Sequence, residues 1–356
     1  MTDLLALTAQ LVDIPSVSRS EEQIADFVVN YLSPAPWLKI DRIGNTILAR
    51  TAEGWQRRIA IAGHLDTVPP SGNERAVIEG DTCRGLGSVD MKGGLAVMLA
   101  LAVNSRPTKT DVTFIFYACE EVASSENSLR ILASQRPDIL ECDSAILCEP
   151  TGGMVEAGCQ GSIRVRTVLT GTRAHTARPW MGKNAIHRLH GLIRAISEHE
   201  SRTVLIDGCE FRESIQAVGV SGGVAGNVVP DRAELVINLR TAPDIDEHGA
   251  LTSLRAVLGS TVNSDAGDTV EVIDSTMGAL PRLDNPLIAE LVALSGVPAK
   301  AKLGLTDVSL FAEIGVSATN FGPGDSSLAH TESEVVSRQE LTESYRVMAE
   351  LIGSEM

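Results

Sequence analysis

Imidazole and carboxylate side chains directly follow three short apolar runs of the sequence. The run R-I-A-I-A is followed by G-H-L-D, which contains His64 and Asp66. The run V-T-F-I-F-Y-A-C is followed by Glu120 and Glu121, and S-A-I-L-C is followed by Glu149. Such runs are typical of buried strands, and ligands of open α/β sheets bind beyond the carboxyl ends of parallel strands. We therefore expect these side chains to meet at one sheet edge, where nitrogen and oxygen donors indicate a metal site.

Two further residues could join this site. Asp90, in G-S-V-D-M-K-G-G, comes just before a predicted helix over residues 95–103, and His330 lies in a loop near the end of the sequence. A helix-capping carboxylate is the structural alternative for Asp90, because the free amides of a first turn favour a negative charge. Likewise, an isolated Glu-Glu pair such as Glu120 and Glu121 is usually a solvated surface pair. Each residue alone is weak evidence for a metal site, whereas all seven together are a specific signal for one.

The donor set favours two metal ions. Nitrogen and oxygen ligands without thiolates suit zinc, manganese or cobalt, and the carboxylates are too many for one tetrahedral ion. Two ions about 3.5–4 Å apart could share a carboxylate and make hydroxide available near neutral pH. Adjacent glutamates diverge at a strand end, so one can bind metal while its neighbour takes the proton of the water.

Composition narrows the class of protein. A chain of 356 residues favours two domains. Aromatic residues are only 3%, so Ala, Val, Leu and Ile must form most of the core, as in parallel strands covered by helices. A net charge of −16 argues against nucleic acid and anionic membranes as partners, because both would repel the chain. The absence of a signal-peptide pattern and of a long apolar run predicts a cytoplasmic protein.

The six cysteines show no C-x-x-C spacing, and packing is their expected role.

The pattern of apolar and polar residues changes after Glu149. Residues 162–276 read as β-α-β-β-α-β, which is the ferredoxin-like order. We therefore predict an α/β fold: a mixed-sheet catalytic domain flanked by helices, formed by residues 1–161 and 277–356, with an inserted ferredoxin-like α+β domain at 162–276.

The motifs H-L-D-T-V-P, G-S-V-D-M-K-G-G, A-C-E-E and C-E-P, with the late His330, resemble the signature of the zinc-dependent M20 aminoacylase and carboxypeptidase family. The resemblance runs through nearly the whole chain. Within the family, F-Y-A-C-E-E-V-A-S-S-E-N-S-L and C-E-P-T-G-G-M-V-E-A-G-C-Q-G-S are most similar to succinyl-diaminopimelate desuccinylases of the actinobacterial type. This resemblance implies hydrolysis of N-succinyl-LL-2,6-diaminopimelate, within lysine and diaminopimelate biosynthesis.

The resemblance also implies individual roles around two Zn²⁺ ions, with Co²⁺ or Mn²⁺ as replacements. One ion would be held by His64, Asp90 and Glu149, and the other by Asp90, Glu121 and His330, with Asp90 bridging. Asp66 would hydrogen-bond His64 and fix its tautomer. Glu120 would be the general base and then the general acid. The family often has a cis peptide bond after the bridging aspartate, here Asp90–Met91.

The inserted domain resembles the lid of the family, which implies a homodimer through that domain. His175, in G-T-R-A-H-T-A-R-P-W, would stabilise the oxyanion, typically in the active site of the partner subunit. Asn227 and Arg240 resemble substrate-binding positions, and Arg240 could pair with a substrate carboxylate. A surface histidine and a structural ion pair are the respective alternatives for His175 and Arg240.

Two departures from the family pattern concern the substrate. K-L-G-L-T-D-V-S lacks an anchoring arginine, so Thr306 and Asp307 carry that match. Arg178 stands where an aromatic residue is frequent. We expect a small N-acyl amino acid as substrate, with Thr306 and Arg178 among its contacts. Acetylornithine deacetylase or a zinc peptidase is the nearest alternative, and a non-catalytic binding protein or a thiol enzyme the more distant ones.

Overall fold

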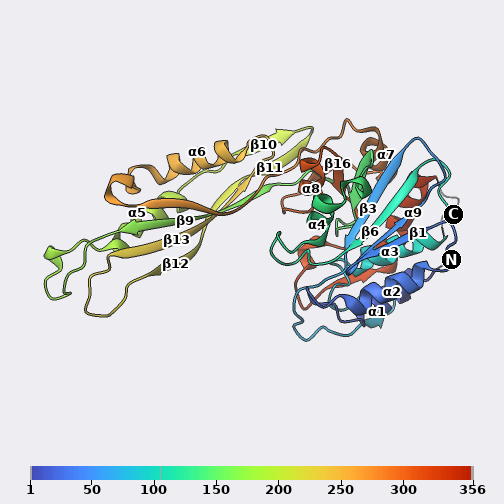
Figure 1. Cartoon of the computed structure of the whole chain (residues 1–356), viewed down its shortest axis with the longest axis horizontal. Coiled ribbons are helices and arrows are strands. Elements are labelled where there is room, and N and C mark those ends of the chain that lie inside the picture. The colour runs from blue at the N-terminus through green and yellow to red at the C-terminus, as the bar shows by residue number, and fades with distance from the viewer. Residues whose placement is uncertain (1, 105, 354–356) are drawn as a thin grey trace. The chain divides into compact units, whose positions relative to one another are not determined.

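The structure is a computed structural model that describes residues 2–104 and 106–353, and it divides into two compact units (Figure 1). The first unit comprises Met1–Ala157, Pro281–Lys300 and Leu310–Met356, and the second comprises Gly158–Leu280 and Ala301–Ser309. The second unit is thus an insertion into the first. The predicted domain boundaries differ from this division by a few residues and do not include the short segment 301–309.

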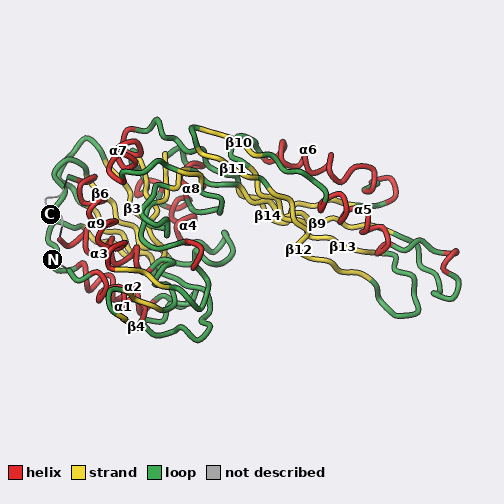
Figure 2. Tube along the Cα trace, turned by 180° about the vertical axis from the view of Figure 1, so that it is seen from behind, coloured by secondary structure: helices red, strands yellow, loops and turns green. Residues whose placement is uncertain are grey.

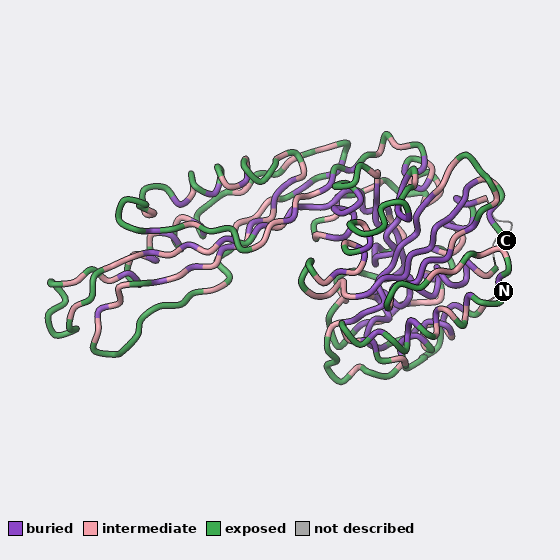
Figure 3. The backbone as a smooth tube through the Cα atoms, viewed as in Figure 1, coloured by how far each residue is buried: buried purple, intermediate pink, exposed green. Residues whose placement is uncertain are grey.

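The first unit is built on an eight-stranded mixed sheet with the order β1-β2-β6-β3-β7-β16-β8-β15. Its strands are β1 (Lys39–Ile43), β2 (Thr46–Arg50), β3 (Arg58–His64), β6 (Asp111–Tyr117), β7 (Ser144–Leu147), β8 (Glu156–Ala157), β15 (Lys300–Ala301) and β16 (Ser317–Asn320). The central strands β6, β3, β7 and β16 run parallel, and they are buried along most of their length (Figure 3). The mostly apolar character of β3, β6 and β7 reflects burial on both faces of the sheet.

A small three-stranded sheet and several helices complete this unit (Figure 2). The small sheet consists of β4 (Val77–Glu79), β5 (Thr82–Arg84) and β17 (Val335–Ser337). The helices are α1 (Leu4–Val12), α2 (Glu22–Leu32), α3 (Lys92–Asn104), α4 (Ser128–Gln135), α7 (Pro286–Ser295), α8 (Val308–Glu313) and α9 (Arg338–Ile352). Helices α1, α2 and α9 pack on α3, which in turn contacts β3 and β6. Helix α3 is therefore buried on nearly every side.

The second unit has the predicted β-α-β-β-α-β order. Its four-stranded antiparallel sheet has the order β12-β13-β9-β14, with a separate hairpin of two strands. The elements are β9 (Gly161–Thr170), α5 (Ala185–Ser197), β10 (Thr203–Ile206), β11 (Cys209–Arg212), β12 (Ser214–Gly222), β13 (Arg232–Thr241), α6 (Glu247–Leu258) and β14 (Thr269–Thr276). Alternate residues of β9 and β13 pack against α5 and α6 and form the core of the unit. The ferredoxin-like prediction is confirmed, and the hairpin β10–β11 is an addition to it.

No helix among the described residues has the length and apolar character needed to cross a membrane.

A buried ion pair joins three parts of the second unit. The Asp268 side chain is fully buried and faces the guanidinium of Arg188 on α5 at 2.6 and 2.7 Å. Its two oxygens also accept hydrogen bonds from the main-chain N–H groups of Thr170 and Asn263, both at 2.8 Å. Burial alone would raise the pKa of Asp268, but the hydrogen bonds from Arg188 and the main chain lower it overall.

We expect Asp268→Asn to lower the free energy of unfolding by about 3 kcal/mol, because it leaves the largely buried Arg188 charge without its carboxylate partner. The lowered pKa of Asp268 stabilises the fold above the ordinary aspartate range, and this stability is lost as the pH falls below about 4. Urea unfolding at pH 7 and at about pH 3 measures both effects. Asp231→Asn, which breaks an exposed pair with Arg173 in the same unit, should change stability by less than about 1 kcal/mol. Equal effects of the two substitutions would contradict this assignment.

Candidate metal centre

The predicted ligands of the first unit come from neighbouring parallel strands. His64 ends β3, which pairs with β6 in a register that places it opposite Tyr117. Glu120 and Glu121 follow β6 by three and four residues. Glu149 comes two residues after Leu147, whose partner Ala62 lies two residues before His64. The register thus places these carboxylates and the imidazole at the same edge of the sheet, as the sequence predicted.

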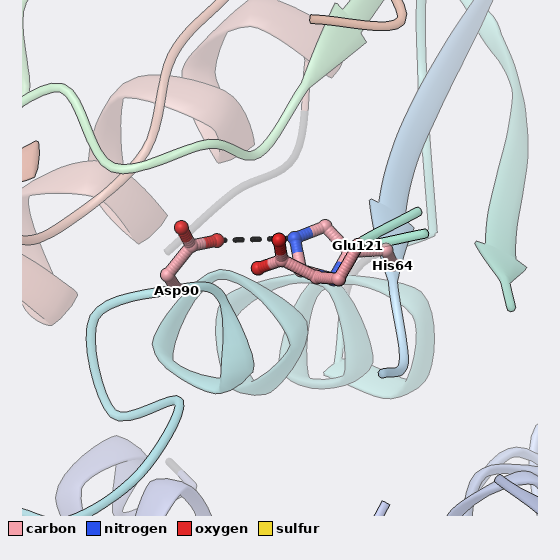
Figure 4. Close-up of side chains that lie close together, drawn as sticks. All are labelled: His64, Asp90 and Glu121. Carbon is pink, nitrogen blue, oxygen red and sulfur yellow. Dashed lines mark hydrogen bonds and ion pairs between the residues drawn. The ribbon is translucent and has the colours of Figure 1, made fainter. Parts of the chain in front are cut away.

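His64 and Asp90 are in direct contact (Figure 4). The Nε2 atom of His64 lies 3.0 Å from Oδ1 of Asp90, and Nδ1 of His64 lies 3.0 Å from the main-chain carbonyl oxygen of Asp66. A carbonyl oxygen only accepts hydrogen bonds, so Nδ1 carries the proton in that contact. Nε2 is therefore the nitrogen that can bind a metal ion.

Asp90 stands between two histidines. Its second oxygen, Oδ2, lies 3.4 Å from Nε2 of His330, and the same nitrogen lies 2.8 Å from Oε1 of Glu121. His64, Asp90 and Glu121 each offer a ligand atom, and these atoms all lie within 4.8 Å of one another (Figure 4). Because each oxygen of Asp90 faces a different imidazole, this carboxylate has the placement expected of a bridging ligand.

Close packing of α3 positions Asp90. The Asp90–Met91 peptide bond is cis, and α3 begins at the next residue, Lys92. Gly94, in the first turn, lies so close to β7 that an added Cβ would stand 2.3 Å from the carbonyl oxygen of Cys148. Only glycine permits this approach. The K-G-G segment after Asp90 therefore lets the start of the helix reach the carboxyl end of the sheet.

Asp66 hydrogen-bonds His64, as predicted, but through its main-chain carbonyl rather than its carboxylate. Its nearest carboxylate oxygen is 3.7 Å from Nδ1 of His64, and its main-chain carbonyl makes the hydrogen bond instead. The carboxylate accepts the N–H groups of Glu120 and Glu121, each at 3.0 Å, and the hydroxyl of Ser18 at 2.8 Å. Two successive amides that point into the site attract an anion more strongly than an imidazole already paired with a carbonyl. Asp66 thus orients both His64 and the Glu120–Glu121 turn.

The backbone of this turn is unusual. Cys119, which precedes Glu120, has a φ of 61°, and His330 has a φ of 62°. Positive φ is uncommon for residues other than glycine and often occurs at functional sites. The Cys119 N–H and thiol both donate to the buried carboxylate of Glu21, at 3.2 and 3.3 Å. Buried carboxylates therefore hold the turn that presents Glu120 on both of its sides.

The side chains of the cluster shift one another's pKa values. Burial alone would lower the pKa of His64, but the hydrogen bond and charge of Asp90, with the charges of Asp66 and Glu120, raise it well above the ordinary value. Hydrogen bonds that His330 donates to the carboxylates of Asp90 and Glu121 raise the pKa of His330 to about 10. Burial alone would raise the pKa of Asp90, and the two histidines lower it overall. The carboxylates thus strongly favour positive charge at this point.

This donor set fits two divalent cations. Two imidazole nitrogens and three carboxylates are available, Asp90 faces both imidazoles, and the proton of His64 lies on the nitrogen away from the cluster. Asp66 lies behind His64 and orients it, as carboxylates and carbonyls do behind metal-binding histidines. The carboxylate of Glu149 is buried at the same sheet edge but is not one of the three residues within 4.8 Å of one another.

Three residues around this site were not predicted. Ser18 and Glu21 lie in the segment before and at the start of α2, and Glu334 lies four residues after His330. Glu334 accepts the N–H groups of Val89 and Asp90. Nothing in the sequence marks them, because a serine and two glutamates near element ends are ordinary surface residues. Only the fold shows that the two glutamates are buried against the site.

The second unit holds the remaining predicted residues, and three of them lie together. The N–H of Thr176 donates to the carbonyl of Asn227, and the N–H of Arg178 donates to the carbonyl of His175. Nδ1 of His175 accepts the N–H of Ala177 at 3.0 Å. His175 in this contact carries its proton on Nε2, and the residue is exposed. His175 is therefore a hydrogen-bond donor to whatever binds there.

Arg240 and Thr306 lie elsewhere in this unit, near the start of β9. Arg240 pairs with Ser162 in the sheet, and the carbonyl of Thr306 accepts a hydrogen bond from the thiol of Cys159. Burial lowers the pKa of Arg240. Within the described parts of the chain Arg240 has no ion-pair partner. The alternative role of Arg240, in a structural ion pair, is therefore not supported. The predicted substrate contacts in the second unit thus form two groups, at opposite ends of β9.

Comparison with known proteins relates the whole chain to one family. Residues 60–354 match the family described as Peptidase family M20/M25/M40. A putative succinyl-diaminopimelate desuccinylase DapE of Mycobacterium tuberculosis is 45% identical over 353 residues, covering 99% of this chain and 98% of that protein. A succinyl-diaminopimelate desuccinylase of Corynebacterium glutamicum is 40% identical over 359 residues, covering 99% and 96%.

Solved structures agree at the level of the fold. A tripeptidase of Staphylococcus aureus has a TM-score of 0.79 at 20% identity, covering 98% of this chain and 97% of that one. The YXEP protein of Bacillus subtilis, described as a dinuclear metal binding peptidase from the M20 family, has a TM-score of 0.72 at 16% identity, covering 98% and 96%. The sequence match, the full-length relatives and the α/β fold with its inserted domain lead to one conclusion: this chain belongs to the M20/M25/M40 peptidase family.

Proposed function

We propose that this protein hydrolyses N-succinyl-LL-2,6-diaminopimelate to succinate and LL-2,6-diaminopimelate. The observation that carries the proposal is the Asp90 carboxylate placed between His64 and His330, with Glu121 beside them. That arrangement supports a two-metal amidohydrolase. The choice of substrate rests on the two desuccinylases, 45% and 40% identical over nearly the full chain.

In this proposal His64, Asp90 and Glu149 would hold one Zn²⁺ ion, and Asp90, Glu121 and His330 would hold the other. Co²⁺ or Mn²⁺ could take the place of Zn²⁺. When bound, the ions supply Lewis acidity and lower the pKa of a water molecule. The YXEP protein of the same fold, described as binding a dinuclear metal, supports the number of ions.

The protein side chains then handle protons and charge. Glu120 takes the proton of the attacking water and returns it to the leaving amine. Its neighbour Glu121 binds metal. Asp66 accepts the main-chain N–H groups of both glutamates and fixes this turn, so the two carboxylates point in different directions. His175 donates its Nε2 proton to the carbonyl oxygen, where negative charge develops.

Positive and polar residues of the second unit contact the anionic substrate. Arg240, partly buried and without an ion-pair partner among the described residues, binds a substrate carboxylate. Arg178 and Asn227 lie beside His175 and contact the acyl or amino-acid part. Thr306, whose buried hydroxyl finds no hydrogen-bond partner within residues 2–104 and 106–353, is a further contact. The two arginines provide local positive charge in a chain of net charge −16.

The proposal includes a homodimer formed through the second unit. Strand β12 is an edge strand, and Val218 and Val220 on it are 57% and 61% exposed. An exposed apolar edge strand is a surface that readily pairs with another chain. His175 lies beyond Thr170, the last residue of β9, and β9 itself spans about 30 Å from its first residue, Gly161. In the proposed dimer this histidine completes the centre of the partner subunit.

We expect the double substitution Val218→Lys and Val220→Lys to give a monomer, because four like charges then face one another across the edge. Losing the His175 of the partner subunit should lower kcat about 10²- to 10³-fold while the metal content stays the same. Light scattering and metal analysis measure the two effects. Ile273→Lys on the opposite edge strand, β14, is the control and should leave the dimer intact. If the double variant stayed dimeric and Ile273→Lys were monomeric, the dimer interface would lie at β14 instead of β12.

The function itself is tested with a panel of N-succinyl-LL-2,6-diaminopimelate, N-acetylornithine and dipeptides. We expect release of succinate from the first compound alone, loss of activity after chelation, and recovery with Zn²⁺ or Co²⁺. Activity on another compound would keep the two-metal chemistry and overturn the substrate. Activity that resists complete metal removal would overturn the mechanism.

A thiol enzyme receives no support from the cysteines. All six are free thiols, and burial raises the pKa of Cys83 and Cys142 to about 11 and that of Cys148 still further. Burial and Glu21 raise the pKa of Cys119 to about 11. Thiols that remain protonated near neutral pH are poor nucleophiles. Free cysteines also fit the proposed cytoplasmic location, where thiols stay reduced.

A further inference from the structure

Glu334 is a buried carboxylate that belongs to the metal centre without being one of its proposed ligands. It is 1% exposed, although glutamate is rarely buried unless it has partners. One of its oxygens, Oε2, accepts the main-chain N–H groups of Val89 and Asp90, at 3.3 and 3.4 Å. A main-chain hydrogen bond from Gly87 also favours its charged form. Glu334 thus binds the amides of the loop that carries Asp90.

The segment that bears Glu334 is itself anchored to this loop. The main-chain carbonyl of Glu334 accepts the N–H of Gly85 at 3.3 Å, and the next residue, Val335, pairs with Arg84 in the three-stranded sheet. His330, four residues earlier, reaches the side chain of Asp90. One short segment therefore contacts Asp90 twice: His330 contacts the carboxylate, and Glu334 holds its main chain.

We propose that Glu334 is a positioning residue that fixes the main chain of Asp90, so that each oxygen of this carboxylate faces one ion of the metal pair. Without the two hydrogen bonds, the 87–90 loop loses the acceptor for its amides, and Asp90 can rotate. Asp90 is the one proposed ligand shared by both ions, so a small rotation affects both positions. This inference rests on the proposed two-metal function and names a residue that supports it.

A purely structural role is the alternative. Lys92 is 2% exposed, its ammonium donates to the carbonyl of Ile14 at 2.8 Å, and burial lowers its pKa to about 7. The charges of Glu334 and Asp13 oppose that lowering. Glu334 could therefore serve only to balance Lys92. Burial in turn raises the pKa of Glu334 to about 7, and an oxygen of the neutral carboxyl still accepts amide hydrogen bonds.

Two substitutions separate these roles. Glu334→Gln keeps the length of the side chain and an oxygen for the amides but removes the charge. Glu334→Asp keeps the charge but shortens the side chain by one methylene, so its oxygens fall short of the amides. Glu334→Ala removes both properties. Glu332→Ala is the matched control, because Glu332 lies in the same segment and its side chain accepts an exposed hydrogen bond from the hydroxyl of Ser71.

The experiment is competition between each metal-free protein and a chromophoric chelator for Zn²⁺ and, separately, for Co²⁺, with the visible spectrum of bound Co²⁺ recorded. We expect the Asp and Ala variants to bind both metals about 10- to 100-fold more weakly, with an altered Co²⁺ spectrum. The Gln variant should stay within about threefold of the wild type, and the control should be unchanged. Thermal unfolding of the metal-free proteins shows whether each variant is folded.

The outcomes distinguish the inference from the function on which it rests. Weak binding in the Gln variant and normal binding in the Asp variant would show that charge matters rather than hydrogen bonding, and would overturn the proposal. Normal metal binding in a destabilised Ala variant would overturn it as well. A wild-type protein that binds two ions leaves the proposed centre standing in both cases. A wild-type protein that binds none would instead reject the centre itself.

Discussion

Replacement of Glu120 by glutamine should lower kcat by about 10²- to 10⁴-fold and leave the metal content unchanged. The amide has nearly the shape of the carboxylate but cannot take a proton from water. Its main-chain N–H still donates to Asp66, so the turn keeps its form. KM should change little, because Glu120 is proposed to act on the water rather than on the substrate. Steady-state kinetics with metal analysis of the same sample tests these expectations.

The matched control for Glu120 is Glu126→Gln, in the same loop after β6. Glu126 forms an exposed pair with Arg19 at 2.6 Å, and the loss of such a pair costs little. We expect kcat to stay within about twofold of the wild type. If Glu120→Gln retained full activity with two ions bound, another residue would be the general base. If it lost the ions, Glu120 would be a ligand and its assigned role would be wrong.

Much of the first unit could be predicted because its strands are short apolar runs that end at polar residues. The runs before His64, Glu120 and Glu149 form β3, β6 and β7, which are adjacent and parallel. Parallel neighbours align their carboxyl ends, so the edge of the sheet collects whatever follows each strand. The sequence thereby predicts which residues meet, but not the distances between their atoms.

The hairpin β10–β11 and the strands β4 and β5 were not predicted, for a common reason. Each has three or four residues, and β4 is exposed throughout while β10 alternates only partly buried residues with exposed ones. A strand of that length and exposure has too few buried positions to show a period of two. Pairing with a neighbour stabilises these strands, and this pairing is not visible in a local stretch of sequence.

The residues that hold the proposed ligands in place are the least predictable part of the site. Asp66 was expected to bond the ring of His64, but its carboxylate binds two amides of the Glu120–Glu121 turn. Glu334 binds amides of the Asp90 loop from a segment far along the chain. A main-chain N–H is present at every residue other than proline, so the sequence gives no indication of which amides need an acceptor.

We expect Asp90→Ala to remove both ions and to lower kcat/KM by roughly three to four orders of magnitude, because the loss of metal assistance costs several kcal/mol. The reason is the position of this one carboxylate, with Oδ1 3.0 Å from His64 and Oδ2 3.4 Å from His330. Asp90→Asn should behave almost as badly, since the neutral amide offers one oxygen and no charge to hold two cations together. Metal content per chain and activity at saturating Zn²⁺ measure both effects.

The control for Asp90 is Asp81→Asn, an 83% exposed side chain near the start of β5 that pairs with Arg338. It should bind two ions and keep full activity. Retention of one ion by Asp90→Asn would show that one half of the centre, either His64 with Glu149 or Glu121 with His330, holds metal by itself. Retention of two ions would mean that Asp90 does not bridge. The contact of Asp90 with both imidazoles would then be purely electrostatic. Its carboxylate would stabilise the charged forms of His64 and His330, whose pKa values it raises.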